Sequence, residues 1–180
     1  MPYEIRPVRA TQWREIRDLR MDALRDEAAP LAFLSTYEEE SAYPDEFWIR
    51  RARTSSLDAG PAADARQFVA MSDDGRWVGT AVTLIERAGQ RDFEERRIER
   101  DGAHVVGVYV RPEHRGHGLI DDLFDAALGW ARERALHRAR LYVHRDNARA
   151  QGAYRRLGFT ATGATFTGAM GPELEMARIL

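Results

Sequence analysis

The chain has 180 residues, of which 44% are apolar and 31% are charged, so one soluble domain over residues 1–180 is expected. Its net charge of -2 gives no electrostatic case for a nucleic-acid partner, and no apolar stretch is long enough to span a bilayer. The absence of cysteine excludes disulfides and thiolate nucleophiles, and the absence of lysine excludes Schiff-base chemistry. Because the N-terminus also lacks the apolar core of a signal peptide, we expect a cytoplasmic location.

The first third of the chain predicts one strand and two helices. Apolar and polar residues alternate over 3–8, which predicts a strand. Thr11 is expected to cap a helix whose apolar pattern stops at Pro30. The segments that follow are expected to be a loop or short helical turn at 31–35, a helix at 45–53, and a loop at 55–64.

A hairpin and a central strand follow. Residues 67–72 and 77–86 are apolar, β-branched runs separated by an Asp-Asp-Gly turn, which predicts a β-hairpin. Residues 87–102 are almost entirely charged and are expected to form a solvated excursion between strands. Residues 105–110 are nearly all apolar, as is typical of a strand in the middle of a sheet.

The remaining segments alternate between helix and strand. Apolar residues from Leu119 mark one face of a helix that is expected to end near His137. The later elements are a strand at 140–144, a helix at 147–157 that Gly158 caps, and strands at 159–166 and 174–179. This order predicts an α/β (α+β) fold. Its one mainly antiparallel mixed sheet has six to seven strands, is flanked by about four helices, and carries a strand–helix–strand unit in its middle.

The segment Arg115-Gly116-His117-Gly118 has the properties of a phosphate-binding turn. It follows a strand and precedes a strongly amphipathic helix, and its glycines permit a positive φ and close approach of a ligand to the backbone. A helix N-terminus offers unpartnered N–H groups and a partial positive charge, which suit a pyrophosphate, and Arg115 adds a cation. A plain strand-to-helix corner is the alternative interpretation of this segment alone.

A second polar segment favours the binding interpretation. Asn147 is placed to cap the helix that follows the next strand. Tyr154 lies seven residues later, which is two turns along the same face of that helix. The amide of Asn147 and the phenol of Tyr154 are therefore expected to lie on the same face of this helix.

Together these two segments resemble the GNAT superfamily of acyl-CoA-dependent N-acetyltransferases. The family's phosphate turn, Arg/Gln-x-x-Gly-x-Gly/Ala, is matched by Arg115-x-x-Gly118-x-Ile120. Its later helix is matched by Asn147, Ala150, Tyr154 and Gly158-Phe159, and its hairpin return by Trp77-Val78-Gly79-Thr80. The resemblance covers most of the chain, is strongest from 67 to 159, and implies the GNAT acyl-CoA N-acyltransferase fold.

The resemblance also implies a reaction and a site. The reaction is transfer of an acetyl group from acetyl-CoA, as cosubstrate and without a metal, to a primary amine that attacks the thioester directly. Tyr154 is implied to be the general acid for the leaving thiolate, and Asn147 to lie at the pantetheine. The other cofactor-binding residues implied are Val108, Tyr109 and Val110 on the central strand, and Arg115, Gly116, His117, Gly118, Leu119 and Ile120 at the pyrophosphate.

Two features depart from the family pattern. Ile120 stands where a Gly or Ala is usual, and its branched side chain either crowds the ligand or points away from it. No general base is evident. Glu38, Glu39 and Glu86 are candidates by region only, and a chain of waters is the alternative.

Other functions remain open at this stage. A non-catalytic acyl-CoA sensor or interaction domain on the same fold is the main alternative, and transfer of a longer acyl group is another. The acceptor is expected to be a small-molecule amine or a protein N-terminus, with no nucleic acid and no membrane involved, and a homodimer is left open. His114 and His117 are not expected to bind a metal, because no carboxylate pattern accompanies them.

Overall fold

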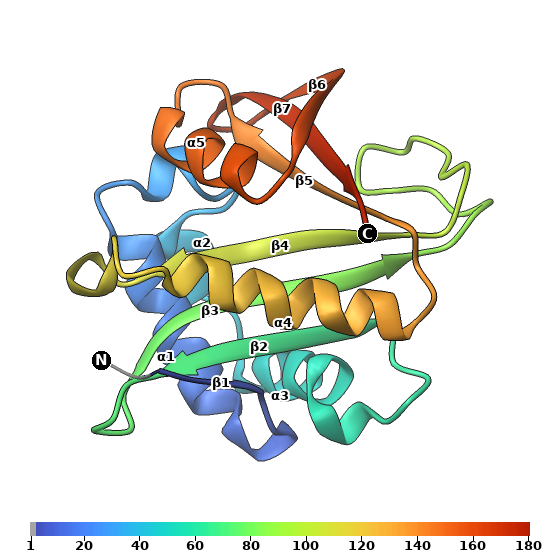
Figure 1. The fold of residues 1–180 in the computed structure, drawn as a ribbon. Helices are drawn as coiled ribbons and strands as arrows, with labels where there is room; N and C mark the ends of the chain where they lie inside the picture. Colours follow the sequence, from blue (N-terminus) through green and yellow to red (C-terminus); the bar gives the residue numbers. More distant parts are fainter. Residues whose placement is uncertain (1–2) are drawn as a thin grey trace.

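A single seven-stranded sheet organises the chain in the computed structural model, which describes residues 3–180 (Figure 1). The strands, in sheet order, are β1 (Glu4–Pro7), β2 (Ala65–Met71), β3 (Trp77–Glu86), β4 (Gly102–Val110), β5 (Arg138–His144), β7 (Gly171–Ile179) and β6 (Thr160–Gly168). All neighbours pair antiparallel except β4 and β5. The predicted mainly antiparallel sheet with a central strand–helix–strand unit is confirmed.

Helices cover both faces of this sheet (Figure 1). They are α1 (Trp13–Arg25), α2 (Tyr37–Ser41), α3 (Asp45–Ser55), α4 (Leu119–Glu133) and α5 (Ala148–Arg156). Strand β2 shows how the faces differ, because Phe68 and Ala70 pack with α4 while Val69 packs with α1 and α3. This alternation follows the two-residue period of a strand. Helices α4 and α5 share a further apolar cluster with β5 and β7.

The two parallel strands at the centre of the sheet diverge. Strands β4 and β5 pair only at Ala103–Ala139 and His104–Arg140. Farther along β4, Gly107 and Val108 lie opposite the single residue Ala81 of β3, and Gly107 has a φ of 60°. Such a bulge bends a strand and increases its twist. The sheet is therefore split at the carboxyl ends of β4 and β5.

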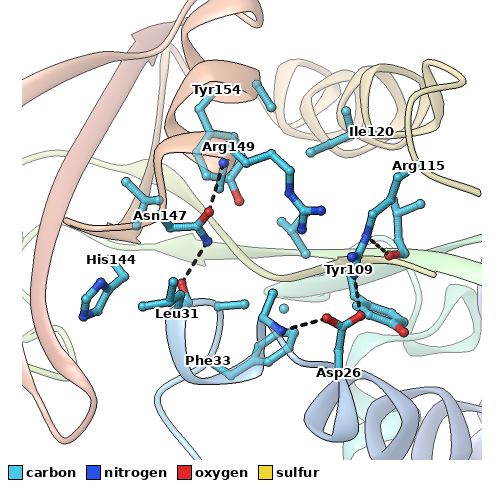
Figure 2. Close-up of a pocket in the computed structure, with 18 of the residues that line it drawn as sticks. Asp26, Leu31, Phe33, Tyr109, Arg115, Ile120, His144, Asn147, Arg149 and Tyr154 are labelled. Carbon is cyan, nitrogen blue, oxygen red and sulfur yellow. Dashed lines mark hydrogen bonds and ion pairs between the residues drawn. The ribbon is translucent and has the colours of Figure 1, made fainter. Parts of the chain in front are cut away.

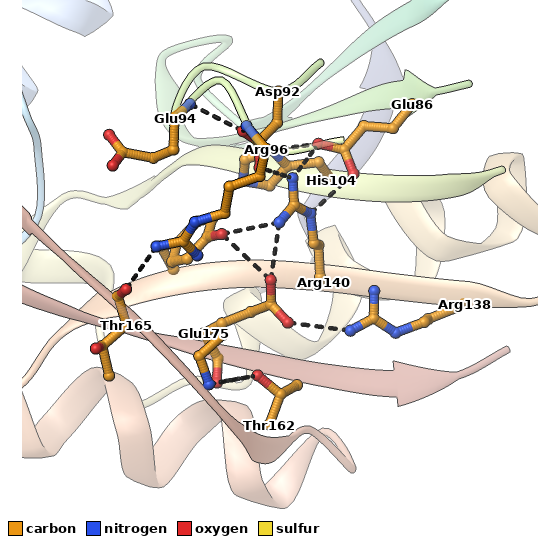
Figure 3. A network of polar contacts seen from close by, with 12 residues as sticks. Glu86, Asp92, Glu94, Arg96, His104, Arg138, Arg140, Thr162, Thr165 and Glu175 are labelled. Atoms are coloured by element: carbon orange, nitrogen blue, oxygen red, sulfur yellow. Dashed lines mark hydrogen bonds and ion pairs between the residues drawn. The ribbon is translucent and has the colours of Figure 1, made fainter. Parts of the chain in front are cut away.

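A buried ionic network lies at the opposite, paired end of β4 and β5 (Figure 3). Arg140 donates hydrogen bonds to Glu86, Asp92 and Glu175 at 2.6–3.0 Å. His104 lies 3.3 Å from Glu86. Because three carboxylates from three segments meet one guanidinium, this network joins β3, β5, β7 and the 87–101 loop.

The same network corrects the expectation that residues 87–102 are merely solvated. Asp92 is only 9% exposed, and its carboxylate accepts hydrogen bonds from Arg140 and from the backbone N–H groups of Glu94 and Arg96. Phe93 packs against the rings of His104, Tyr142 and Phe166. The loop therefore folds back onto the sheet, which local charge alone did not predict.

Two predicted helix boundaries were also wrong. Thr11 does not cap α1, because a short 3-10 turn over Ala10–Gln12 precedes the helix and the Gln12 side chain accepts the Arg9 N–H. Helix α1 ends at Arg25, ahead of Pro30. Residues 37–41, for which no element was predicted, form helix α2, which begins with a reciprocal capping box between Thr36 and Glu39. In the described residues, no helix is long and apolar enough to cross a membrane.

Candidate functional site

The split between β4 and β5 opens into a pocket of about 490 Å³ (Figure 2). Its walls come from β4, the end of β5, the turn before α4, the first two turns of α5, and the segment 26–33 after α1. Of the predicted site residues, it brings together Val108, Tyr109, Val110, Arg115, Gly116, Gly118, Leu119, Ile120, Asn147 and Tyr154. His117 does not line the pocket, and its side chain is exposed.

Strand β4 presents backbone groups to this pocket. The Arg111 N–H donates to the Val78 carbonyl on β3. Because the backbone groups of successive strand residues point to opposite neighbours, the backbone groups of Val110, and of Val108 two residues before it, are expected to point away from β3 and toward β5. On that side β5 has already diverged. The Val110 carbonyl accepts the Arg115 Nε–H at 2.9 Å, which leaves the Val110 N–H on the side of the opening.

The turn before α4 is built to expose N–H groups. Gly116 and Gly118 have φ values of 80° and 79°, and Gly118 is the N-cap of α4. Within residues 3–180, no hydrogen-bond partner is found for the five backbone N–H groups from Gly116 to Ile120. Consecutive free N–H groups at a helix N-terminus form an anion site, because they add to the positive end of the helix dipole.

The Arg115 side chain differs from the expectation that it adds a charge at the phosphate. Its guanidinium donates to the Asp26 carboxylate, whose side chain is 5% exposed, as well as to Val110. Asp26 is the C-cap of α1. Arg115 therefore ties the turn to α1, and most of its charge is already paired (Figure 2).

Ile120 packs against the protein. Its side chain is partly buried and joins the apolar clusters that α4 shares with the sheet, although it also borders the pocket. The next residue, Asp121, lines the pocket, whereas Asp122 is exposed. Leu119 belongs to the core. The branched side chain thus packs against both apolar clusters and also forms part of the pocket wall.

Tyr154 lies in the wall of the pocket, on α5, and its side chain points into the pocket (Figure 2). It is 8% exposed and packs beside the rings of Phe124 and Phe159. Burial raises the pKa of its hydroxyl, and the nearby charge of Glu173 raises it further. No hydrogen bond to this hydroxyl occurs in the described part of the chain. Tyr154 therefore stays protonated near neutral pH and has a proton to donate.

Asn147 joins two walls of the pocket. Its side-chain oxygen accepts the Ala150 N–H and caps α5, as predicted. Its amide nitrogen donates to the Leu31 carbonyl at 2.9 Å (Figure 2). Both polar atoms are therefore engaged within the protein, so Asn147 holds the 26–33 segment against α5.

Several lining residues were not anticipated. Arg149 and Arg156 bring two guanidinium groups from α5, and no ion pair or hydrogen bond of the Arg149 side chain is found in residues 3–180. Figure 2 shows the Arg149 side chain reaching across the pocket toward the turn. Phe33 and Glu173 also line the pocket. Nothing local in the sequence marks these residues, because the split sheet brings them to the pocket.

Glu38, Glu39 and Glu86, which were candidate general bases from their position in the sequence alone, do not reach the pocket. Burial favours a higher pKa for Glu86, but hydrogen bonds from His104 and Arg140 and their charges lower it to about 2. Glu39 is used in the capping box of α2, and Glu38 is on the same short helix. None of the three lines the pocket.

Comparisons with known proteins agree with this geometry. The sequence model described as Acetyltransferase (GNAT) family matches residues 13–159. The chain is 33% identical over 135 residues to a mycothiol acetyltransferase of Saccharomonospora viridis, covering 75% of the chain and 42% of that protein. It is 36% identical over 104 residues to a streptothricin acetyltransferase of Streptomyces lavendulae, covering 58% and 49%. The chain thus spans less than half the length of these two relatives.

Solved structures share the whole fold. A GNAT superfamily phosphinothricin acetyltransferase from Sinorhizobium meliloti, solved in complex with AcCoA, superposes with a TM-score of 0.72 at 18% identity. The match covers 100% of the chain and 89% of that structure. At this identity the likeness establishes the fold, which agrees with the split sheet and the two-sided helical cover.

Proposed function

Because the chain belongs to the acetyltransferase (GNAT) family, we propose that it transfers the acetyl group of acetyl-CoA to a primary amine by direct attack of the amine on the thioester. The observation that carries this proposal is a single pocket with three features. It holds a run of free N–H groups, an open strand edge and a protonated phenol. These are the groups that a pyrophosphate, a pantetheine amide and a leaving thiolate require.

The free N–H groups from Gly116 to Ile120 bind the pyrophosphate in this proposal. Arg149 adds a cation from the opposite wall, where no carboxylate of the described chain competes for it. Asp121 opposes the phosphates, but it lies in the first turn of α4, where a carboxylate also stabilises the helix. Binding therefore depends on backbone donors more than on side-chain charge.

The edge of β4 orients the reacting end. The pantetheine arm takes the place of a neighbouring strand and pairs with the backbone groups of Val108 and with the Val110 N–H. One of these N–H groups polarises the thioester carbonyl. Catalysis by this route comes from holding the amine and the thioester in contact. Tyr154 then donates its proton as the C–S bond breaks.

The acceptor class follows from the relatives only in outline. Their names specify small molecules, mycothiol and streptothricin, and in one case an alanine of a ribosomal protein. We therefore propose a small-molecule amine or a protein N-terminus as the acceptor. A cytoplasmic location and a possible homodimer are also retained as proposals. The non-catalytic alternative rested on Ile120, on Asp121 and Asp122, and on the missing base. It is not favoured, because the family model and the named relatives are acetyltransferases.

An acceptor screen tests the proposal. Thiol release from acetyl-CoA is followed with streptothricin, a peptide with an N-terminal alanine, and a set of simple primary amines. We expect turnover with at least one of these compounds that exceeds hydrolysis without an amine at least tenfold. Binding of acetyl-CoA without turnover on any compound would contradict the proposal and support a sensor.

A further inference from the structure

One buried carboxylate of the pocket has no partner among the described residues. Glu173 is on β7, next to His144 of β5 and Phe166 of β6 in the sheet register. Its residue is 6% exposed, and it lines the same pocket as Tyr154. Among residues 3–180, its side chain makes no hydrogen bond and no ion pair, yet its oxygens are not sealed from the pocket.

Two other carboxylates near the pocket are compensated. Glu175, two residues along the same face of β7, accepts from Arg138, Arg140 and Tyr142. Asp26, across the pocket, is held by Arg115. A buried carboxylate without a cation or donor is costly, and such groups occur mainly where they act on a ligand.

His144 does not supply the missing partner. Its Nδ1 accepts the Asp146 N–H at 3.1 Å, so that nitrogen carries no proton. Its Nε2 then carries the proton and donates it to the Met170 carbonyl at 3.1 Å. Both nitrogens are engaged by backbone groups, so neither bonds to Glu173, and the ring holds the β6–β7 hairpin against the end of β5.

The surroundings of Glu173 suit a base. Burial raises the pKa of its carboxyl, and the charge of His144 opposes this effect to a smaller extent. A carboxylate with a raised pKa is a stronger base than a free glutamate. Its charge also acts on Tyr154, so the two groups lie at one end of the pocket.

Building on the acetyl transfer proposed above, we infer that Glu173 binds the ammonium group of the acceptor and accepts one of its protons. The neutral amine then forms the C–N bond to the thioester carbonyl carbon, and the C–S bond breaks. The thiolate takes the Tyr154 proton, and the second proton lost by the nitrogen returns to that phenol. One proton leaves Glu173 for solvent, so the balance is ammonium plus thioester to amide, thiol and H⁺.

The test compares three variants with the wild-type enzyme, using the best amine from the acceptor screen. We expect Glu173→Gln to lower kcat/KM at pH 7 at least a hundredfold, with the Kd for acetyl-CoA changed less than twofold. For Glu173→Asp, kcat/KM should rise with pH as it does in the wild type, but its values should be lower throughout. Glu38→Gln, which alters an exposed carboxylate outside the pocket, should match the wild type in all respects.

The pH profile separates a base from a structural residue. The Glu173→Gln enzyme should continue to gain rate with pH until the amine itself deprotonates in solution, whereas the wild type levels off earlier. Its urea unfolding midpoint at pH 8 should equal or exceed that of the wild type, because an unpaired buried charge is removed.

The outcomes are distinguishable. An active wild type with an equally active Glu173→Gln enzyme and an unchanged pH profile would overturn the role of Glu173 alone. A wild type that turns over no amine would instead overturn the proposed function.

Discussion

The guanidinium of Arg115 and the carboxylate of Asp26 are paired across 89 residues of sequence, at the junction between the phosphate turn and the end of α1. The same guanidinium holds the Val110 carbonyl at the end of β4. One side chain therefore fixes the turn relative to a helix and a strand. This relationship makes Arg115 a positioning residue in our account, with the backbone N–H groups as the anion donors.

Breaking this pair should loosen the turn and destabilise the fold. Arg115→Met leaves the buried Asp26 charge without its cation and should cost about 2 kcal/mol in the free energy of unfolding. Adding Asp26→Asn to the same chain should restore part of that loss. Urea unfolding of both single variants and the double variant measures the coupling. Strictly additive losses would show that the pair contributes nothing.

The hydroxyl of Tyr154 should matter for turnover and little for affinity. Because it makes no hydrogen bond within residues 3–180, Tyr154→Phe should fold normally and bind acetyl-CoA within about twofold of the wild type. Loss of a general acid should lower kcat on the order of a hundredfold. Steady-state kinetics and calorimetry check both values.

Tyr109 provides the matched control for Tyr154. It is a second buried phenol in the same pocket, on the other wall, and Tyr109→Phe should leave kcat within about threefold. Equal losses of kcat and of acetyl-CoA affinity in Tyr154→Phe would argue that the phenol only binds.

Ile120→Ala tests whether the branched side chain crowds the phosphates. Since Ile120 packs in apolar clusters, the truncation should lower the free energy of unfolding by about 1–2 kcal/mol. The Kd for acetyl-CoA should change less than threefold. A tenfold gain in affinity without loss of stability would mean that the side chain occupies ligand space.

The Arg140 network should dominate acid stability. Glu86 has a folded-state pKa of about 2 against an ordinary value of 4.5, so its contribution is complete above about 4.5 and is lost as the pH falls toward 2. That shift corresponds to about 3 kcal/mol. Unfolding followed from pH 6 to pH 2 should show this loss.

Arg140→Met should remove that acid-dependent stability. Between pH 4.5 and 2, the free energy of unfolding of the variant should fall less steeply, and at pH 7 the variant should be less stable by about 3 kcal/mol, because three carboxylates lose their cation. Parallel pH curves for wild type and variant would contradict the assignment.

Local chemistry explains what the sequence could predict. The turn at Gly116 and Gly118, the cap at Asn147 and the position of Tyr154 each depend on residues within two helical turns. The apolar periods likewise predicted the strands and the longer helices. The five-residue helix α2 has no apolar stripe, and only the spacing of Thr36 and Glu39 marked its start.

Long-range pairing explains what the sequence could not predict. Asp26 meets Arg115 across 89 residues, and Asp92 meets Arg140 across 48. Glu173 enters the pocket because β7 inserts between β5 and β6. Such contacts depend on the strand order and on the split after His104, neither of which leaves a local signal.

Calorimetric titration with acetyl-CoA tests the central claim, that the split between β4 and β5 binds this cosubstrate. We predict a Kd in the micromolar range for the wild type. It should weaken about tenfold in Arg149→Ala, which removes a guanidinium that has no partner among residues 3–180 from the pocket. It should stay unchanged in Arg155→Ala, since Arg155 lies outside the pocket and bonds to Gln151. No binding below millimolar concentration, or equal effects of the two substitutions, would contradict the account.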